Sequence, residues 1–252
     1  AVGNVVGSNI CNILLILGVT AALFPVDIDR RAFARDGTVM ALATAVALGL
    51  VLLGVIARPV GLLLVAAVIA YVVYTYRAER RAHSPAEVVY GEEAELKTTP
   101  SLGLAGGAAL AVAGLVGVVV GADLLVEAAT TLARAAGVSE AAIGLTVVAL
   151  GTSLPELATA VMAGLKKQTE VAFGNVVGSN IFNILFILGA TASVQPLAIP
   201  PEIARFDIWV MVAATAAMIL AVRTGFRITR REGVALLAAY ALYLGVVATA
   251  SL

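Results

Sequence analysis

Residues 3–18 read GNVVGSNICNILLILG, and residues 174–189 read GNVVGSNIFNILFILG. The two segments are identical at 14 of 16 positions and lie 171 residues apart. The same offset relates later residues, namely Thr20 to Thr191, Pro25 to Pro196, Asp36 to Asp207, Val39 to Val210, Met40 to Met211 and Thr44 to Thr215. A repeat of this kind predicts that the chain contains two homologous halves.

The apolar character of the chain determines which solvent it folds in. Of 252 residues, 61% are hydrophobic and 13% are charged, with a mean hydropathy of +1.03, whereas soluble domains carry roughly 25% charged residues. We count eight apolar runs, at residues 3–24, 37–57, 60–76, 101–133, 140–165, 171–195, 207–222 and 233–251. Because about 20 apolar residues cross the bilayer as a helix, the sequence excludes a water-soluble globule. It predicts an all-α polytopic membrane protein, with the lipid bilayer as its partner.

The repeat also predicts how the chain is divided. Residues 1–76 hold the remainder of the first half, residues 77–100 form a charged, turn-rich linker, and residues 101–252 hold the second half with five helices. The offset of 171 would place the counterpart of residues 101–173 before residue 1, and the chain opens with alanine rather than methionine. We therefore expect about 70 preceding residues with two more spans, and ten spans in the intact protein.

The positions of the basic residues predict the orientation, because Lys and Arg accumulate in short cytoplasmic loops. Alternate connections separate them into a set of thirteen and a set of three. The larger set is Arg30, Arg31, Arg35, Arg77, Arg80, Arg81, Lys97, Lys166, Lys167, Arg223, Arg227, Arg230 and Arg231, and the smaller is Arg58, Arg134 and Arg205. The linker 77–100 is thus predicted to be cytoplasmic, and the two repeated helices, five spans apart, to cross in opposite directions. The 16 basic and 16 acidic residues balance, which gives no reason to expect nucleic-acid binding.

Inverted repeats are typical of secondary transporters, whose ion sites lie near the bilayer midplane where the halves meet. Glu156 fits such a site, because it lies inside the apolar run 140–165. An ionisable group there costs roughly 2.5–3.5 kcal/mol and needs a functional reason. A proline kink, with the glutamate satisfied by a neighbouring helix, is the alternative interpretation.

The segment around Pro155 predicts a cluster of oxygen atoms. Proline cannot donate a backbone hydrogen bond and its ring clashes with the carbonyl four residues back, so the helix is expected to open and free the carbonyls of residues 149–151. These carbonyls, the hydroxyls of Thr152 and Ser153 and the Glu156 carboxylate would lie at one depth. Hard oxygen ligands of this kind suit Ca²⁺ or Na⁺.

The repeated helix carries a polar stripe in each copy, formed by residues spaced four apart. The stripes are Asn4, Ser8 and Asn12 in the first copy and Asn175, Ser179 and Asn183 in the second, with Asn9 and Asn180 beside them. Such residues often only hold membrane helices together through hydrogen bonds. Two antiparallel copies beside a mid-span carboxylate favour an ion site instead.

These motifs resemble the cation/Ca²⁺ exchanger superfamily, and in particular the prokaryotic sodium/calcium exchangers. The resemblance rests on GLTVVALGTSLPE at 144–156, on GNVVGSNIFN at 174–183 and on the related segment 3–12. It implies an inverted-repeat exchanger fold with ten transmembrane helices when intact. It also places the second alpha-repeat at 144–189 and the end of the first alpha-repeat within 1–76.

The resemblance also implies a set of metal ligands. The glutamate after the proline, Glu156, would be the principal ligand, and the other members would be the Ala149 carbonyl and the side chains of Thr152, Ser153, Ser179, Asn183, Ser8 and Asn12. Some members of the superfamily have aspartate at the position of Asn183, which leaves the number of Na⁺ ions and any proton coupling open.

The expected function is exchange of Na⁺ for Ca²⁺ by alternating access at this oxygen-lined site, with the ions as substrates and no cofactor. A H⁺/Ca²⁺ or other cation exchanger, a cation channel and a non-transporting fragment are the alternatives. No nucleophile–base pair, phosphate loop or His/Cys cluster in the sequence predicts an enzyme. The shortness of the linker 77–100 favours a prokaryotic inner membrane.

Overall fold

The computed structural model describes residues 2–82, 103–135, 137 and 149–250. The greater part of the predicted linker 77–100, and the first five residues of the motif at 144–156, lie outside these ranges. The described first half comprises α1 (Val2–Ile10), η1 (Cys11–Leu17), α2 (Gly18–Leu23), α3 (Arg30–Ala32), η2 (Phe33–Gly37), α4 (Thr38–Leu52) and α5 (Arg58–Ala82). The second comprises α7 (Leu104–Ala135), α9 (Ala149–Thr152), α10 (Leu154–Leu165), α11 (Thr169–Phe182), η4 (Asn183–Ile187), α12 (Leu188–Val194), η5 (Ile203–Asp207), α13 (Ile208–Arg223) and α14 (Arg230–Ala250).

The helices confirm the prediction of an all-α polytopic membrane protein. Within the described ranges, seven helices are long and apolar enough to cross a membrane, and α10 is a shorter apolar helix at the position of the fifth predicted span. The second span begins at Arg30, earlier than its apolar run predicts. The reason is that the Asp29 carboxylate accepts the backbone N–H groups of Arg31 (2.9 Å) and Ala32 (2.8 Å), so a capped, charged turn precedes the apolar residues.

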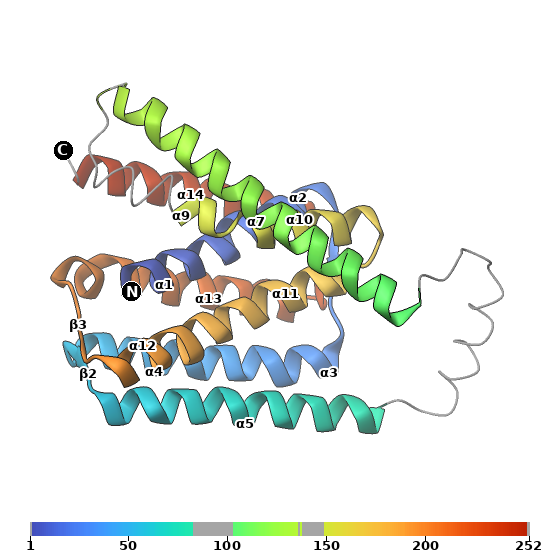
Figure 1. Cartoon of the computed structure of the whole chain (residues 1–252), viewed down its shortest axis with the longest axis horizontal. Coiled ribbons are helices and arrows are strands. Elements are labelled where there is room, and N and C mark those ends of the chain that lie inside the picture. Colours follow the sequence, from blue (N-terminus) through green and yellow to red (C-terminus); the bar gives the residue numbers. More distant parts are fainter. Residues whose placement is uncertain (1, 83–102, 136, 138–148, 251–252) are drawn as a thin grey trace.

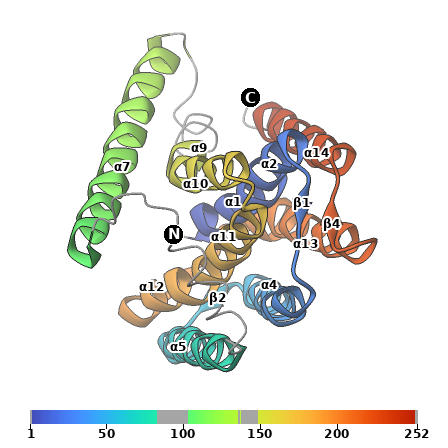
Figure 2. The same ribbon diagram turned by 90° about the vertical axis from the view of Figure 1, so that its right-hand side faces the viewer.

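The two repeated helices lie at the centre of the molecule and run in opposite directions (Figures 1 and 2). Each copy contains a π-helical segment at the same repeat position, η1 in the first and η4 in the second. The segments η2 and η5, which lead into α4 and α13, correspond in the same way. The repeat in the sequence is therefore also a repeat in local backbone geometry, and its two copies are inverted.

Two short strand pairs join the halves at opposite ends of the helices. The strand β1 (Val26–Asp27) pairs antiparallel with β4 (Arg227–Ile228), and β2 (Val55–Ile56) pairs antiparallel with β3 (Leu197–Ala198). By the repeat offset β1 corresponds to β3, and β2 corresponds to β4 with a shift of one residue, so one pair is the inverted counterpart of the other. Each of these four loops is thus paired with a loop of the other half.

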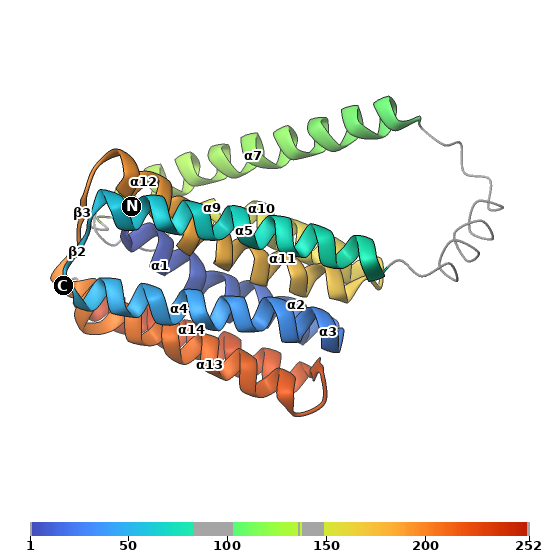
Figure 3. The same cartoon turned by 90° about the horizontal axis from the view of Figure 1, so that it is seen from below.

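Close helix contacts through glycine follow the same symmetry. A Cβ atom added to Gly61 on α5 would lie 2.6 Å from the backbone nitrogen of Ser193 on α12, and one added to Gly233 on α14 would lie 2.5 Å from that of Ala22 on α2. Glycine allows the backbones to approach in both places. The long helix α7 packs against α9 and α10 and lies on the opposite side of the molecule from α13 and α14 (Figure 3).

Several of the basic residues lie at the ends of the helices, beside the two strand pairs. Arg227 pairs with Asp27 in the β1–β4 sheet (3.1 Å) and Arg230 donates to the carbonyl of Leu23 (3.2 Å), so members of the larger basic set gather at that end. Arg58 follows β2 and Arg205 follows β3, so both lie at the β2–β3 end. That the β1–β4 end is the cytoplasmic one stays a prediction.

Candidate cation site

The candidate site lies where the first copy of the repeated helix crosses the second. The Nδ2 atom of Asn12 donates to Oδ1 of Asn180 (3.2 Å), and Nδ2 of Asn183 donates to Oδ1 of Asn9 (3.4 Å). Because Asn9 corresponds to Asn180 and Asn12 to Asn183, these are two inverted copies of one contact. The four amides form a reciprocal bridge between the halves, which we call the asparagine bridge.

The asparagine bridge combines both interpretations of the polar stripes. The amide nitrogens of Asn12 and Asn183 hold the two helices together, as membrane asparagines often do. Because the nitrogens of Asn12 and Asn183 are used in these hydrogen bonds, the side-chain oxygens of the same two residues remain available to accept a hydrogen bond or to bind a cation. Asn12 is 1% exposed, and its Oδ1 accepts no hydrogen bond within the described part of the chain.

The helix break expected at Pro155 is present. The helix α9 ends at Thr152 and α10 begins at Leu154, with Ser153 between them at φ −100° and ψ 1°. The backbone N–H of Ser153 donates to the carbonyl of Leu150 (3.1 Å), three residues back, rather than to that of Ala149. Pro155 at the start of α10 supplies no N–H, so the ladder of helical hydrogen bonds is interrupted where the sequence predicts it.

Glu156 lies in the first turn of α10 and faces the core of the molecule. The Asn175 side chain on α11 donates to the backbone carbonyl of Glu156 (3.3 Å), which ties the two helices of the second half together at this point. The Oε2 atom of Glu156 is buried and accepts no hydrogen bond from any described residue. Among the described residues, no neighbouring helix satisfies this oxygen, whereas a purely structural glutamate would be expected to have such a partner.

The break also adjoins the first copy of the repeated helix. The surroundings of the buried Cys11 thiol on η1 include Ser153, Tyr240 and the Glu156 carboxylate, and α10 packs against both η1 and α11. The side chains from the broken helix and from the two repeated helices therefore converge on one region. This is the arrangement that an ion site between two inverted halves requires.

The remaining predicted ligands differ in how deeply their side chains are buried. Ser153 is buried, as is Ser8 on α1, whereas Ser179 and Asn183 are half-buried on α11 and η4. Ala149 begins α9. The side chain of Thr152 falls outside what the structure describes.

Asn9 and Asn180 are the residues whose part in the site sequence reasoning missed. They were noted only as lying beside the polar stripes, yet they are 1% and 0% exposed and supply both acceptors of the asparagine bridge. The signal was present, because both occur in the segment GSNI of each copy. Conversely, Asn4 of the predicted first stripe is exposed.

The charge available to a bound cation is small. Among the described residues, no group of three or more His, Cys, Asp or Glu side chains is placed to hold a metal ion. In the part of this region that the structure describes, Glu156 supplies one carboxylate, beside neutral amide, hydroxyl and carbonyl oxygens. A set of neutral oxygens with few charges suits Na⁺ and Ca²⁺ better than transition metals, which favour imidazole and thiolate ligands.

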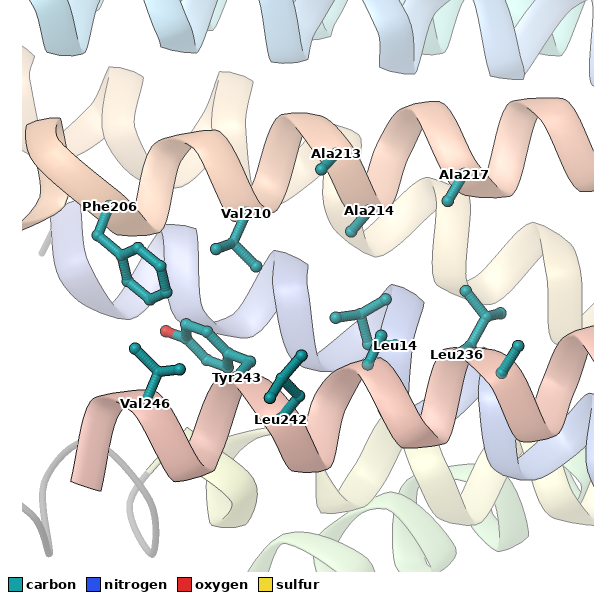
Figure 4. A pocket seen from close by; sticks show the side chains of 12 residues that line it. Leu14, Phe206, Val210, Ala213, Ala214, Ala217, Leu236, Leu242, Tyr243 and Val246 are labelled. Carbon is teal, nitrogen blue, oxygen red and sulfur yellow. The ribbon is translucent and has the colours of Figure 1, made fainter. Parts of the chain in front are cut away.

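A separate cavity lies between α13 and α14 and has a different character (Figure 4). It has a volume of about 470 Å³ and is lined by aliphatic and aromatic side chains, with Leu14 of η1 at its floor. The Phe206 and Tyr243 rings stack at one end, 6.1 Å apart, and the Tyr243 hydroxyl donates to Asp207 (3.0 Å). This apolar groove offers no set of oxygen ligands to a cation.

Comparison with known proteins agrees with this geometry. The family model described as sodium/calcium exchanger protein matches residues 1–77 and 106–249. A protein of Alkalimonas amylolytica named as an antiporter, CaxA, is 36% identical over 248 residues, which cover 96% of this chain and 76% of that protein. The inner membrane protein YrbG of Escherichia coli is 32% identical over 206 residues, covering 80% of this chain and 62% of YrbG.

A solved structure also matches. The sodium-calcium exchanger NCX_Mj, soaked with Na⁺ and Sr²⁺, aligns with a TM-score of 0.78 at 28% identity, over 96% of this chain and 75% of that chain. The inverted repeats, the helix interrupted before a half-buried glutamate and the asparagine bridge therefore occur in a chain that belongs to the sodium/calcium exchanger protein family.

Proposed function

We propose that this protein exchanges Na⁺ for Ca²⁺ across a prokaryotic inner membrane, by presenting one central site alternately to the two sides. The observation that supports it most directly is the pair of buried acceptors, Asn12 Oδ1 and Glu156 Oε2, that receive no hydrogen bond from the described residues. An unpaired buried acceptor costs about 1–3 kcal/mol. A cation between the halves would remove that cost.

The proposed ligands are Glu156, the Ala149 carbonyl, and the side chains of Thr152, Ser153, Ser179, Asn183, Ser8 and Asn12. Glu156 would supply the charge, and the neutral oxygens would replace the hydration shell of the ion. In the asparagine bridge, Asn9 and Asn180 would hold the Asn183 and Asn12 amides so that their oxygens face the ion. Competition between Na⁺ and Ca²⁺ for the same oxygens would couple the two fluxes.

One carboxylate does not balance the charge of Ca²⁺. We propose that a second carboxylate comes from a helix equivalent to α10 that packs on the second copy of the repeated helix. An apolar face at the corresponding place is open: Phe182, Phe186 and Ile187 are exposed, whereas their counterparts in the first copy are covered by α10 and α14. With both carboxylates, a loaded site would be nearly neutral and the empty site doubly negative, so loading would favour crossing.

The decisive experiment is Glu156→Gln in membrane vesicles loaded with Na⁺. The amide keeps the shape of the side chain and removes its charge, so Na⁺-gradient-driven uptake of radioactive Ca²⁺ is expected to fall to the level of empty vesicles. Glu170→Gln, at an exposed position in the first turn of α11, is the matched control and should transport normally. Unchanged uptake by Glu156→Gln would contradict the proposal.

The same vesicles separate this function from its alternatives. Uptake that follows a pH gradient and ignores Na⁺ would identify a H⁺/Ca²⁺ exchanger instead. Ca²⁺ flux that is insensitive to every counter-gradient would identify a channel. An exchanger predicts that reversing the Na⁺ gradient reverses the Ca²⁺ flux.

A further inference from the structure

A second cavity, at the β1–β4 end of the molecule, combines basic and apolar walls. It lies between the start of the α3–η2–α4 helix and the end of α13, with a volume of about 510 Å³. Arg30 and Arg223 supply its charge, and no acidic residue lines it. Its other walls are mainly apolar and include Phe33, Leu42, Ile219 and Phe226.

Arg30 is held at the cavity by an aromatic ring. Its guanidinium carbon lies 4.6 Å from the centre of the Phe226 ring, which itself packs edge-on against Phe33 at 6.0 Å. Phe226 has φ +53°, in the left-handed region that favours glycine. By the repeat offset its counterpart is Val55, and the residue with a positive φ in that turn is the neighbouring Gly54, at φ +80°. A bulky residue at such a φ is strained and persists where the surroundings or a function require it.

The inverted repeat provides an internal comparison for the two arginines. At the related place near the β2–β3 end, the positions of Arg30 and Arg223 are taken by Pro201 and Leu52. One arginine occurs there, Arg205, at the position of Ala34. Since the same backbone fold forms with proline and leucine, the fold does not require the paired arginines.

The nearby carboxylates do not neutralise this cavity. Asp27 pairs with Arg227 (3.1 Å), the Asp29 carboxylate caps the helix that begins at Arg30, and Glu232 accepts from Thr229 (2.7 Å). Arg35 pairs with Asp36 (2.7 Å). The charge of Arg30 and Arg223 is therefore available to an anion from outside the chain.

The position of the cavity identifies the class of anion. Arg30 begins one membrane-length helix and Arg223 ends another, so the arginines lie where a bilayer presents its headgroups. The exposed Leu42 side chain and Ile219 lie further along the same two helices, toward the hydrocarbon. Basic pockets between transmembrane helices are typical binding places for acidic lipid headgroups.

We propose that this cavity binds an anionic phospholipid from the leaflet at the β1–β4 end. The phosphate would lie between the guanidinium groups of Arg30 and Arg223, which form charge-assisted hydrogen bonds with it. An acyl chain would follow the apolar wall past Leu42 and Ile219. Free inorganic phosphate would satisfy the arginines and leave the apolar wall without a partner.

Native mass spectrometry of the purified protein in detergent tests this directly. Phosphatidylglycerol and phosphatidylcholine are titrated against the wild type, against Arg30→Gln/Arg223→Gln, and against the control Arg58→Gln/Arg205→Gln, whose arginines lie at the other end. We expect the first double variant to weaken phosphatidylglycerol binding about tenfold or more, with the control and phosphatidylcholine binding unchanged. Equal weakening in both double variants would overturn the proposal.

Two further measurements keep the test decisive. If the double variant fails to fold, Arg223→Leu alone, which installs the residue of the repeat-related position, should still weaken phosphatidylglycerol binding severalfold. Competition with inorganic phosphate in excess should leave the bound lipid in place. Displacement of the lipid by phosphate, or full binding to Arg223→Leu, would show that the cavity does not recognise a lipid.

Discussion

The helix α1–η1–α2 and its inverted copy α11–η4–α12 share 14 of 16 residues in their repeated segment, yet their surroundings differ. Cys11 and Ile16 are 0% exposed, whereas the corresponding Phe182 and Ile187 are 42% and 38% exposed. The first copy is covered by α10 and α14, and no described element covers the matching face of the second. The nearly identical sequences thus form the same local structures, the π-helical segment and the asparagine bridge. The burial of each copy depends instead on which helices pack against it.

The largest effect is expected from exchanging the residues at one of the two positions where the copies differ. Cys11→Phe forces an aromatic ring into a fully buried place beside Ser153 and Tyr240, so we expect a loss of about 3 kcal/mol or more in stability. Phe182→Cys, on the exposed face, should cost less than about 1 kcal/mol. Thermal unfolding in detergent measures both, and equal losses would show that the two faces are equally covered.

Glycine substitutions test whether the two halves are packed alike. Gly61→Ala and Gly233→Ala should each destabilise by about 2 kcal/mol, since each added methyl meets the backbone of a facing helix. Gly49→Ala on α4 is the control, because a Cβ there meets no atom within 4 Å, and it should stabilise slightly through helix propensity. A loss of stability at only one of Gly61 and Gly233 would show that the two halves are not packed alike.

The asparagine bridge allows a comparison of function between the copies. Asn180→Leu and Asn9→Leu each remove one acceptor. We expect about 1 kcal/mol of destabilisation from either, together with a raised apparent KM for Ca²⁺. Asn180→Asp keeps an oxygen facing Asn12 and should restore the KM toward that of the wild type. A purely structural role predicts unchanged KM in every variant whose fold is intact.

The smallest effect is expected where α4 and α13 meet. The hydroxyls of Thr44 and Thr215 lie 3.4 Å apart, and Thr215 also donates to the carbonyl of Met211 (2.9 Å). Thr44→Val and Thr215→Val should each cost about 0.6 kcal/mol or less. A double-mutant cycle gives their coupling, and a coupling well above that value would contradict the weak contact.

Much of the fold could be predicted because the repeat and the apolar runs are strong signals. The order of the spans, their inversion and the break before Pro155 all follow from residue types whose physical effects are local. The asparagine bridge could not be predicted in the same way. Asn9 and Asn12 lie close together on one helix, and which of their amides meet Asn180 and Asn183 depends on how the second copy crosses the first.

The boundaries of the spans show the same limit. The apolar run predicts a helix from residue 37, but Asp29 caps an earlier start and the charged turn from Arg30 is helical as well. The strand pairs β1–β4 and β2–β3 are two residues long, too short for a pattern of alternation to reveal. These strand pairs form because loops far apart in the sequence meet, and that meeting depends on the tertiary structure.

The two strand pairs have a consequence for the origin of the architecture. Each joins the earlier strand of one half to the later strand of the other, so the contact is self-complementary in the manner of an isologous dimer interface. Two separate copies of a single half, inserted upside down relative to each other, could form both pairs without any new contact surface. Joining the two halves in one chain would then only connect them covalently. Gene duplication followed by fusion would preserve a self-complementary dimer that had existed before.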